Sequence, residues 1–210
     1  MLAALAPAAG AAPASAAGTI GASGVGDPFY PLGGNGGIDV EDYGLDLAYD
    51  PAMWFGDAVT LRVWPDIWLH EGFATWSEWI WFERQGGKTA AQRFKQLANT
   101  PAQQSWFWKP PPGDPGTAAD LLDGTIYDRG AMTLQALRQR IGDATFLEVL
   151  RGWYAEHKYG NASTAEFVAL AERESGQDLG AFFDAWLYTP GKPAGLPDGT
   201  ATAEATRTRR

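Results

Sequence analysis

Hydrophobic residues repeat with two different periods along the chain, and the change falls near residue 54. From residue 43 to residue 49, large apolar residues (Tyr43, Leu45, Leu47, Tyr49) alternate with small or acidic ones. A period of two over this stretch predicts a strand with one buried face. No second strand pattern follows it, so the sequence offers this strand no obvious partner, although an isolated strand is unstable.

The longest helical pattern lies in the middle of the chain. Asp66 is placed to cap a helix that starts near Ile67, and Gly86 with Gly87 is expected to end it. Apolar side chains cover nearly every face of this segment, which is typical of a helix inside a larger body. We therefore interpret its tryptophans as core residues and as the lining of a cleft, not as an exposed row that binds carbohydrate.

Further helices are predicted from the same spacing and from their capping residues. Asp143 is placed to cap one helix, Ser163 and Glu166 form a capping box for another, and Asp178 starts the last. The expected helices cover 88–98, 125–141, a stretch from 143, 163–174 and a stretch from 178, with a Pro-rich loop over 101–116. The fold is thus predicted to be mainly α, preceded by a short β-strand remnant.

At both ends of the chain the composition becomes simple. Residues 1–24 are rich in Ala, Gly, Ser and Pro, and Ala14-Ser15-Ala16 has the small-residue pattern of a signal-peptidase site. We predict an export signal within residues 1–26 and hence a secreted protein; a flexible low-complexity tail is the alternative. Residues 190–210 are polar, end in arginines and are predicted to be disordered. No apolar run is long enough for a membrane span.

Charge and composition argue against several classes of protein. The 210-residue chain has a formal net charge of −9 and no basic patch, which argues against binding to nucleic acid. It contains no cysteine, so disulfides and thiolate metal sites are excluded. Two histidines, His70 and His157, are too few for most imidazole-based metal sites. His70 is interpreted as a packing or surface residue, and His157 as a histidine at the C-terminus of a helix.

Several motifs follow one another in a fixed order after residue 53. They are WFGD at 54–57, a W-x-D-x-W run from Trp64 to Trp68, HEGFAT at 70–75 and IYDRGAM at 126–132. This order resembles the membrane alanyl aminopeptidase (aminopeptidase N) family of zinc metallopeptidases, which are gluzincins. The resemblance implies a thermolysin-like helical catalytic domain that uses zinc and hydrolyses N-terminal residues from peptide substrates. Residues 26–51 also resemble the opening of that family's N-terminal β-domain.

The resemblance implies roles for particular residues. Glu71 stands where the family has a glutamate that binds zinc. Tyr127 stands where the family has a tyrosine whose hydroxyl donates to the oxyanion, and Asp128 with Arg129 matches the charged pair after it. Glu78, two helical turns beyond Glu71, is either a partner that orients Glu71 or a solvated carboxylate.

The other half of the family's zinc site, the H-E-x-x-H motif, is missing from this sequence. Counting back from Glu71 by the family's spacing places the two histidines at Ala48 and Ala52 and the base glutamate at Tyr49. A zinc site needs about three protein donors. We therefore expect little or no metal binding and an inactive pseudoenzyme.

Together these features predict four segments. They are an export signal (1–26), a remnant of the N-terminal β-domain (27–52), the C-terminal part of a catalytic domain (53–189) and a disordered tail (190–210). The joint between the second and third segments makes this an internally truncated metallopeptidase. Two alternatives remain open: a non-catalytic helical module that binds peptides through its aromatic surface, and a gene-model deletion that joins two ends of one gene.

Overall fold

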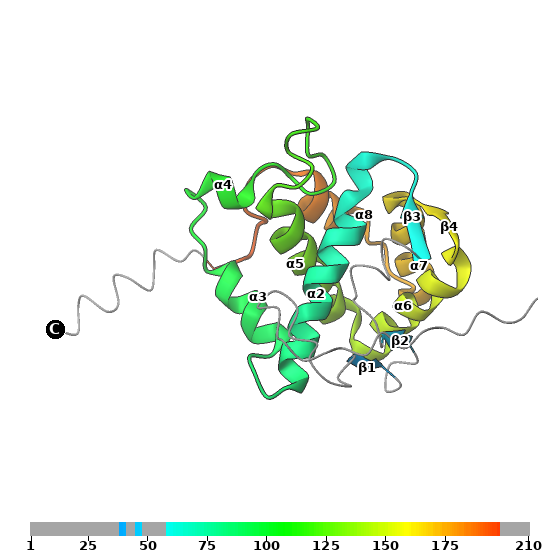
Figure 1. Cartoon of the computed structure of the whole chain (residues 1–210). Helices are drawn as coiled ribbons and strands as arrows, with labels where there is room; N and C mark the ends of the chain where they lie inside the picture. The colour runs from blue at the N-terminus through cyan, green and yellow to red at the C-terminus, as the bar shows by residue number, and fades with distance from the viewer. Residues whose placement is uncertain (1–37, 41–44, 48–57, 198–210) are drawn as a thin grey trace, which may run out of the picture. The chain divides into compact units, whose positions relative to one another are not determined.

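The computed structural model describes residues 38–40, 45–47 and 58–197, and it is mainly helical, as the sequence predicts (Figure 1). The strands are β1 (Ile38–Val40), β2 (Leu45–Leu47), β3 (Val59–Leu61) and β4 (Gly160–Ala162). The α-helices are α2 (Trp68–Arg84), α3 (Ala90–Ala98), α4 (Ser105–Trp108), α5 (Gly124–Ile141), α6 (Asp143–His157), α7 (Thr164–Ser175) and α8 (Gly180–Phe183). A 3-10 turn, η3 (Trp64–Ile67), precedes α2, and a π-helical turn, η4 (Asp184–Tyr188), follows α8.

The strand predicted from the alternating pattern is present as β2, and it has a partner. β1 pairs with β2 in antiparallel register, with Ile38 opposite Leu47 and Val40 opposite Leu45. The expectation that the strand lacks an obvious partner was therefore wrong. A three-residue strand is too short to show a period of its own, which is why the sequence pattern did not indicate β1.

A second pair of strands joins distant parts of the chain. β3 and β4 run parallel, with Val59 opposite Gly160 and Leu61 opposite Ala162. An ion pair next to these strands extends the link. Two guanidinium nitrogens of Arg62 donate to the Glu166 carboxylate, at 2.8 and 3.1 Å. The start of the described body is thereby fixed to the start of α7.

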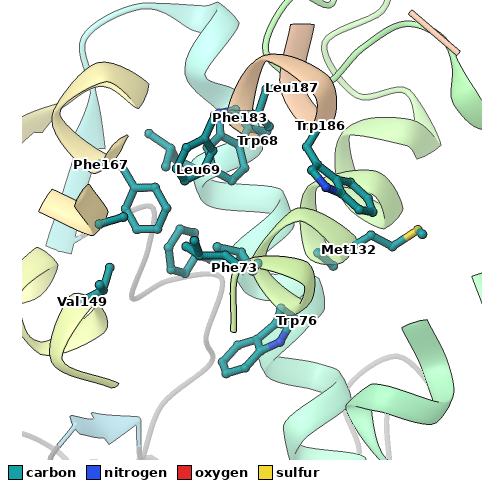
Figure 2. Close-up of a cluster of buried hydrophobic side chains, with 14 of the residues drawn as sticks. Trp68, Leu69, Phe73, Trp76, Met132, Val149, Phe167, Phe183, Trp186 and Leu187 are labelled. Atoms are coloured by element: carbon teal, nitrogen blue, oxygen red, sulfur yellow. The ribbon is translucent and has the colours of Figure 1, made fainter. Parts of the chain in front are cut away.

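Helices α2 and α5 form the centre of the body, with α3 against both of them (Figure 1). Aromatic side chains fill the space between α2 and the later helices. Phe167 lies edge-on to Trp68, Phe73 and Trp153, with ring centroids 5.9, 5.3 and 5.2 Å away. Figure 2 shows Phe167 with Trp68 and Phe73, together with Phe183 of α8 and Leu187 of η4.

Most of the described tryptophans are core residues, as the sequence analysis expected. Those buried are Trp68, Trp76, Trp79, Trp108, Trp153 and Trp186. Trp64 and Trp106 are exposed. Burial of large rings on α2 confirms that this helix lies inside a larger body, because its apolar faces contact other elements on several sides.

Asp66 does not cap α2, contrary to the sequence prediction. The 3-10 turn η3 runs into α2 without a break, and no side chain accepts from the first turn of α2. The Asp66 carboxylate instead accepts from Thr164, at 2.6 Å from its hydroxyl and 3.2 Å from its backbone nitrogen. Asp66 thus holds the first residue of α7, and this partner lies 98 positions along the chain.

Asp143 also has a different place from the one predicted. It is the first residue of α6, and Gly142, with φ +85°, occupies the capping position before it. The Asp143 carboxylate accepts from Arg138 on α5 at 2.9 Å. Glycine is suited to this position, because its positive φ strains other residues.

The remaining helix boundaries follow their local signals. Thr89 forms a capping box with Gln92 at the start of α3, and the Ser163 side chain accepts from the backbone nitrogen of Glu166 in α7. Asp178 accepts from the Gly180 nitrogen at the start of α8. α2 ends before Gly86, which has φ +79°. None of the described helices combines the length and apolar character needed to cross a bilayer.

The beginning of the C-terminal segment is attached to the body. Lys192 Nζ donates to the Thr100 carbonyl at 2.8 Å, and the Gly191 nitrogen donates to the Trp108 carbonyl at 3.3 Å. Residues 190–197 therefore have defined contacts, although the sequence analysis assigned them to the tail. The predicted export signal and residues 198–210 lie outside the described residues, so those predictions stay predictions.

Candidate functional site

Glu71 and Tyr127 face one another from the two central helices. Glu71 is in the first turn of α2, and Tyr127 is in the first turn of α5. The two helices touch through glycine: a Cβ on Gly72 would lie only 2.8 Å from the backbone carbonyl carbon of Gly130. Because Gly72 follows Glu71 and Gly130 lies one turn after Tyr127, this close crossing brings the two functional groups together.

Each of these two groups alters the ionisation of the other. Burial raises the pKa of Glu71, and a polar interaction with the Tyr127 hydroxyl partly opposes this rise. Burial also raises the pKa of Tyr127, and the negative charge of Glu71 raises it further. Tyr127 therefore stays a neutral phenol at pH 7, in the state that can donate a hydrogen bond.

Asp128 and Glu78 lie on a neighbouring cavity of about 410 Å³. Glu78 is on an exposed part of α2, seven residues after Glu71, while Asp128 directly follows Tyr127 on α5. Burial raises the pKa of Asp128, and the positive charge of Arg93 opposes the rise. The role of Glu78 as a partner that orients Glu71 stays a prediction.

Neither histidine is arranged as a metal ligand beside Glu71. His70 Nε2 lies 3.1 Å from the Val59 carbonyl oxygen, so this ring links α2 to β3. The His157 ring packs on Trp153 at the end of α6, with ring centroids 4.4 Å apart. His70 is thus placed as a packing residue, and His157 lies at the C-terminus of its helix, as the sequence predicts.

The described residues do not fit a zinc ion at Glu71. Within 58–197 no group of three or more His, Cys, Asp or Glu side chains could hold a metal. One carboxylate does not make a zinc site, because zinc in a hydrolase is held by about three protein ligands. Residues 48–52, where the sequence resemblance would place H-E-x-x-H, lie outside the described residues and contain no histidine.

Comparisons with known proteins identify the family. A sequence model described as "Peptidase family M1 domain" matches residues 52–186. The chain belongs to peptidase family M1. Among M1 relatives, "Aminopeptidase N" of Streptomyces lividans is 33% identical over 157 residues, which cover 66% of this chain and 17% of that protein. "Aminopeptidase N" of Lactococcus lactis is 30% identical over 161 residues, 71% of this chain and 19% of that protein.

Solved structures agree with this family assignment. An M1 zinc metallopeptidase from Deinococcus radiodurans, bound to a Tyr-Ser-Ala substrate, is 31% identical with a TM-score of 0.59, over 71% of this chain and 33% of that one. Native yeast LTA4 hydrolase, at 21% identity and a TM-score of 0.55, shares the fold. This M1 chain spans less than a quarter of the length of the curated relatives named above.

The sequence analysis missed the structural importance of Arg129. Its guanidinium is fully buried and donates to the carbonyls of Trp108 (2.8 Å), Ala185 (3.0 Å) and Thr189 (2.7 Å). Burial lowers its pKa to about 10, so it stays charged at pH 7. One sequence feature could have indicated this role: Arg129 lies among the apolar residues of α5. Arg129 fixes the end of α4 and the end of η4 to the helix that carries Tyr127.

Proposed function

We propose that this chain retains two residues of an M1 aminopeptidase active site, the Glu71 carboxylate and the Tyr127 phenol. By itself the chain is an inactive pseudoenzyme. The observation that supports this proposal most directly is the pairing of Glu71 with Tyr127 at the α2–α5 crossing. Its relatives include proteins named aminopeptidase N, which supports peptides as the ligand class. The proposal extends to export from the cell, which rests on the small-residue pattern at 14–16 alone.

Glu71 and Tyr127 can bind a peptide but cannot complete its hydrolysis. Tyr127, held neutral, can donate its hydroxyl proton in a hydrogen bond to a peptide carbonyl oxygen. Glu71 provides a half-buried negative charge beside it. Zinc in this family would supply an activated water, but the described residues offer it one carboxylate and no imidazole. No hydrolytic step follows from these side chains.

A zinc measurement combined with an activity assay tests this proposal. Purified protein is incubated with zinc, desalted and analysed by mass spectrometry for metal, and hydrolysis of alanine p-nitroanilide is followed in parallel. We expect far less than one zinc per chain, and hydrolysis at the rate of a sample that contains EDTA. Tyr127→Phe is expected to leave that background rate unchanged.

Two variants make the zinc result decisive. Glu71→Ala removes the candidate ligand, whereas Glu148→Ala removes an exposed carboxylate on α6 and serves as the control. Stoichiometric zinc that is lost in Glu71→Ala but retained in Glu148→Ala would overturn the proposal. Zinc-dependent release of p-nitroaniline that Tyr127→Phe abolishes would overturn it as well.

A further inference from the structure

The cavity beside the Glu71–Tyr127 pair is bounded by three helices. α2, α3 and α5 each contribute to its wall, and its volume is about 410 Å³, within the usual range for small-molecule pockets. On α2 the spacing of Thr75, Glu78 and Phe82 places them on one helical face. The lining residues are Thr75, Glu78, Trp79, Phe82, Lys88, Arg93 and Asp128.

Two half-buried groups of opposite charge face this cavity without binding each other. Arg93 is on α3 and Asp128 is on α5. They are close enough for the Arg93 charge to act on Asp128, yet no ion pair within 4.0 Å joins them. Among the described residues, no side-chain hydrogen bond engages the Arg93 guanidinium or the Asp128 carboxylate. Both groups have therefore lost part of their water without gaining a protein partner.

Several other basic groups of the described body differ from Arg93 in this respect. Arg62, Arg138 and Arg173 each bind a carboxylate within 3.0 Å. Lys88, at the rim of the same cavity, donates to Gln96 at 2.9 Å. Arg93 is thus the cavity's available donor for an incoming anion, and its planar guanidinium can bind a carboxylate through two parallel hydrogen bonds.

The apolar part of the wall is aromatic. Trp79 is buried behind the cavity, whereas Phe82 is 50% exposed. A ligand side chain placed against Phe82 would remove apolar surface from water. The cavity thus offers the Arg93 guanidinium, the Asp128 carboxylate and an aromatic surface within one small volume.

We propose that this cavity binds a free α-amino acid with an apolar side chain. Its carboxylate binds Arg93, its ammonium group binds Asp128 with Glu78 nearby, and its side chain contacts Phe82. An anion alone would be repelled by Asp128, and a cation alone would be repelled by Arg93. A zwitterion satisfies both groups at once. This binding requires neither zinc nor Glu71, so it goes beyond the proposed function.

Calorimetric titration of the full chain with L-phenylalanine in the presence of EDTA tests the proposal. We expect saturable binding in EDTA. L-Phenylalanine amide lacks the carboxylate, and N-acetyl-L-phenylalanine lacks the ammonium group. Each is expected to bind at least about tenfold more weakly, because each loses a charge-assisted hydrogen bond. These two ligands test both charges on the unaltered protein.

Substitutions then assign the charges to residues. Arg93→Gln and Asp128→Asn are each expected to weaken phenylalanine binding at least about tenfold. Lys95→Gln on the same helix α3 alters an exposed charge outside the cavity and is expected to have no effect. Melting curves of the variants establish that they are folded.

Two results would overturn the inference. One is no heat of binding at about 10 mM phenylalanine, a concentration that detects even millimolar affinity. The other is binding that the amide and the N-acetyl derivative reproduce with equal affinity. Zinc content and p-nitroanilide hydrolysis report on Glu71 and Tyr127 instead, so the two proposals can fail separately.

Discussion

Gly72 of α2 and Gly130 of α5 are in backbone contact, and a Cβ added to Gly130 would lie 2.9 Å from the Cα of Gly72. No side chain fits between the helices at this point. The two peptide backbones therefore approach more closely than any pair of residues with Cβ atoms allows. This contact determines how far apart the Glu71 carboxylate and the Tyr127 hydroxyl lie.

Gly72→Ala should therefore destabilise the protein. The added methyl group would meet the backbone of Gly130, which cannot move as a side chain can, so we expect a loss of about 1–3 kcal/mol in the free energy of unfolding. Urea unfolding followed by circular dichroism measures the change. Gly124→Ala is the matched control, because its Cβ meets nothing within 4 Å. Equal stability of both variants would contradict a close α2–α5 contact.

Arg129→Met should be strongly destabilising, because it leaves the carbonyls of Trp108, Ala185 and Thr189 without their buried donor. We expect a loss of about 3 kcal/mol or more. Arg129→Lys keeps the positive charge but lacks the planar guanidinium with its several donors. Its free energy of unfolding should lie between those of Arg129→Met and the wild type. Arg140→Met, at an exposed position of the same helix, is the control. A Met variant as stable as wild type would show that these bonds contribute nothing net.

Asp66→Ala tests whether this residue connects η3 to α7. Its removal takes away two hydrogen bonds to Thr164, whose hydroxyl also accepts from the Trp68 indole at 2.9 Å. We expect a loss of about 2 kcal/mol in urea unfolding. Asp143→Ala, which removes an exposed ion pair, should lose less than about 1 kcal/mol. A larger loss in Asp143→Ala than in Asp66→Ala would contradict the link from Asp66 to α7 and would favour the cap role that the sequence suggested for Asp143.

The pH dependence of stability should change in Glu71→Gln. Because burial raises the folded-state pKa of Glu71 above 4.5, the folded chain binds more protons than the unfolded chain between these two values. The stabilisation is complete below the unfolded pKa and is lost as pH rises through the folded pKa. Unfolding free energies across the acid range should therefore fall less steeply with pH in Glu71→Gln than in wild type.

Tyr127→Phe provides the opposite test of the same pair. The Tyr127 hydroxyl lowers the pKa of Glu71, so its removal should raise that pKa further and widen the pH range over which stability is lost. Urea unfolding at a series of pH values measures the slope. A slope that is unchanged in both variants would show that Glu71 and Tyr127 do not interact.

Local features of the fold could be predicted from the sequence because their causes are local. The serine cap at Ser163 acts within one helical turn, and so does Asp178, which accepts from the Gly180 nitrogen at the start of α8. The order of motifs around Glu71 and Tyr127 identified the family. The two helices that carry these residues were predicted to within a few positions of their observed starts.

The remainder depends on contacts between distant residues, for which the sequence has no periodic pattern. Asp66 was predicted to cap α2 because that helix is its neighbour in the sequence. Its actual partner, Thr164, comes 98 positions later. Arg129 binds three carbonyls from two separate segments, and backbone carbonyls have no sequence signature. The cavity that holds Arg93 and Asp128 forms only once α3 has packed against α2 and α5.

The parallel pair β3–β4 has a consequence for the order in which the chain folds. The Thr60 hydroxyl donates to the Gly160 carbonyl across 100 positions, so pairing these strands closes a long loop that contains α2 to α6. Contacts between such distant positions slow folding. During translation at about 5–20 residues per second, β4 would be synthesised on the order of ten seconds after β3. The open edge of β3 would be exposed to chaperones, or to neighbouring nascent chains, throughout that interval.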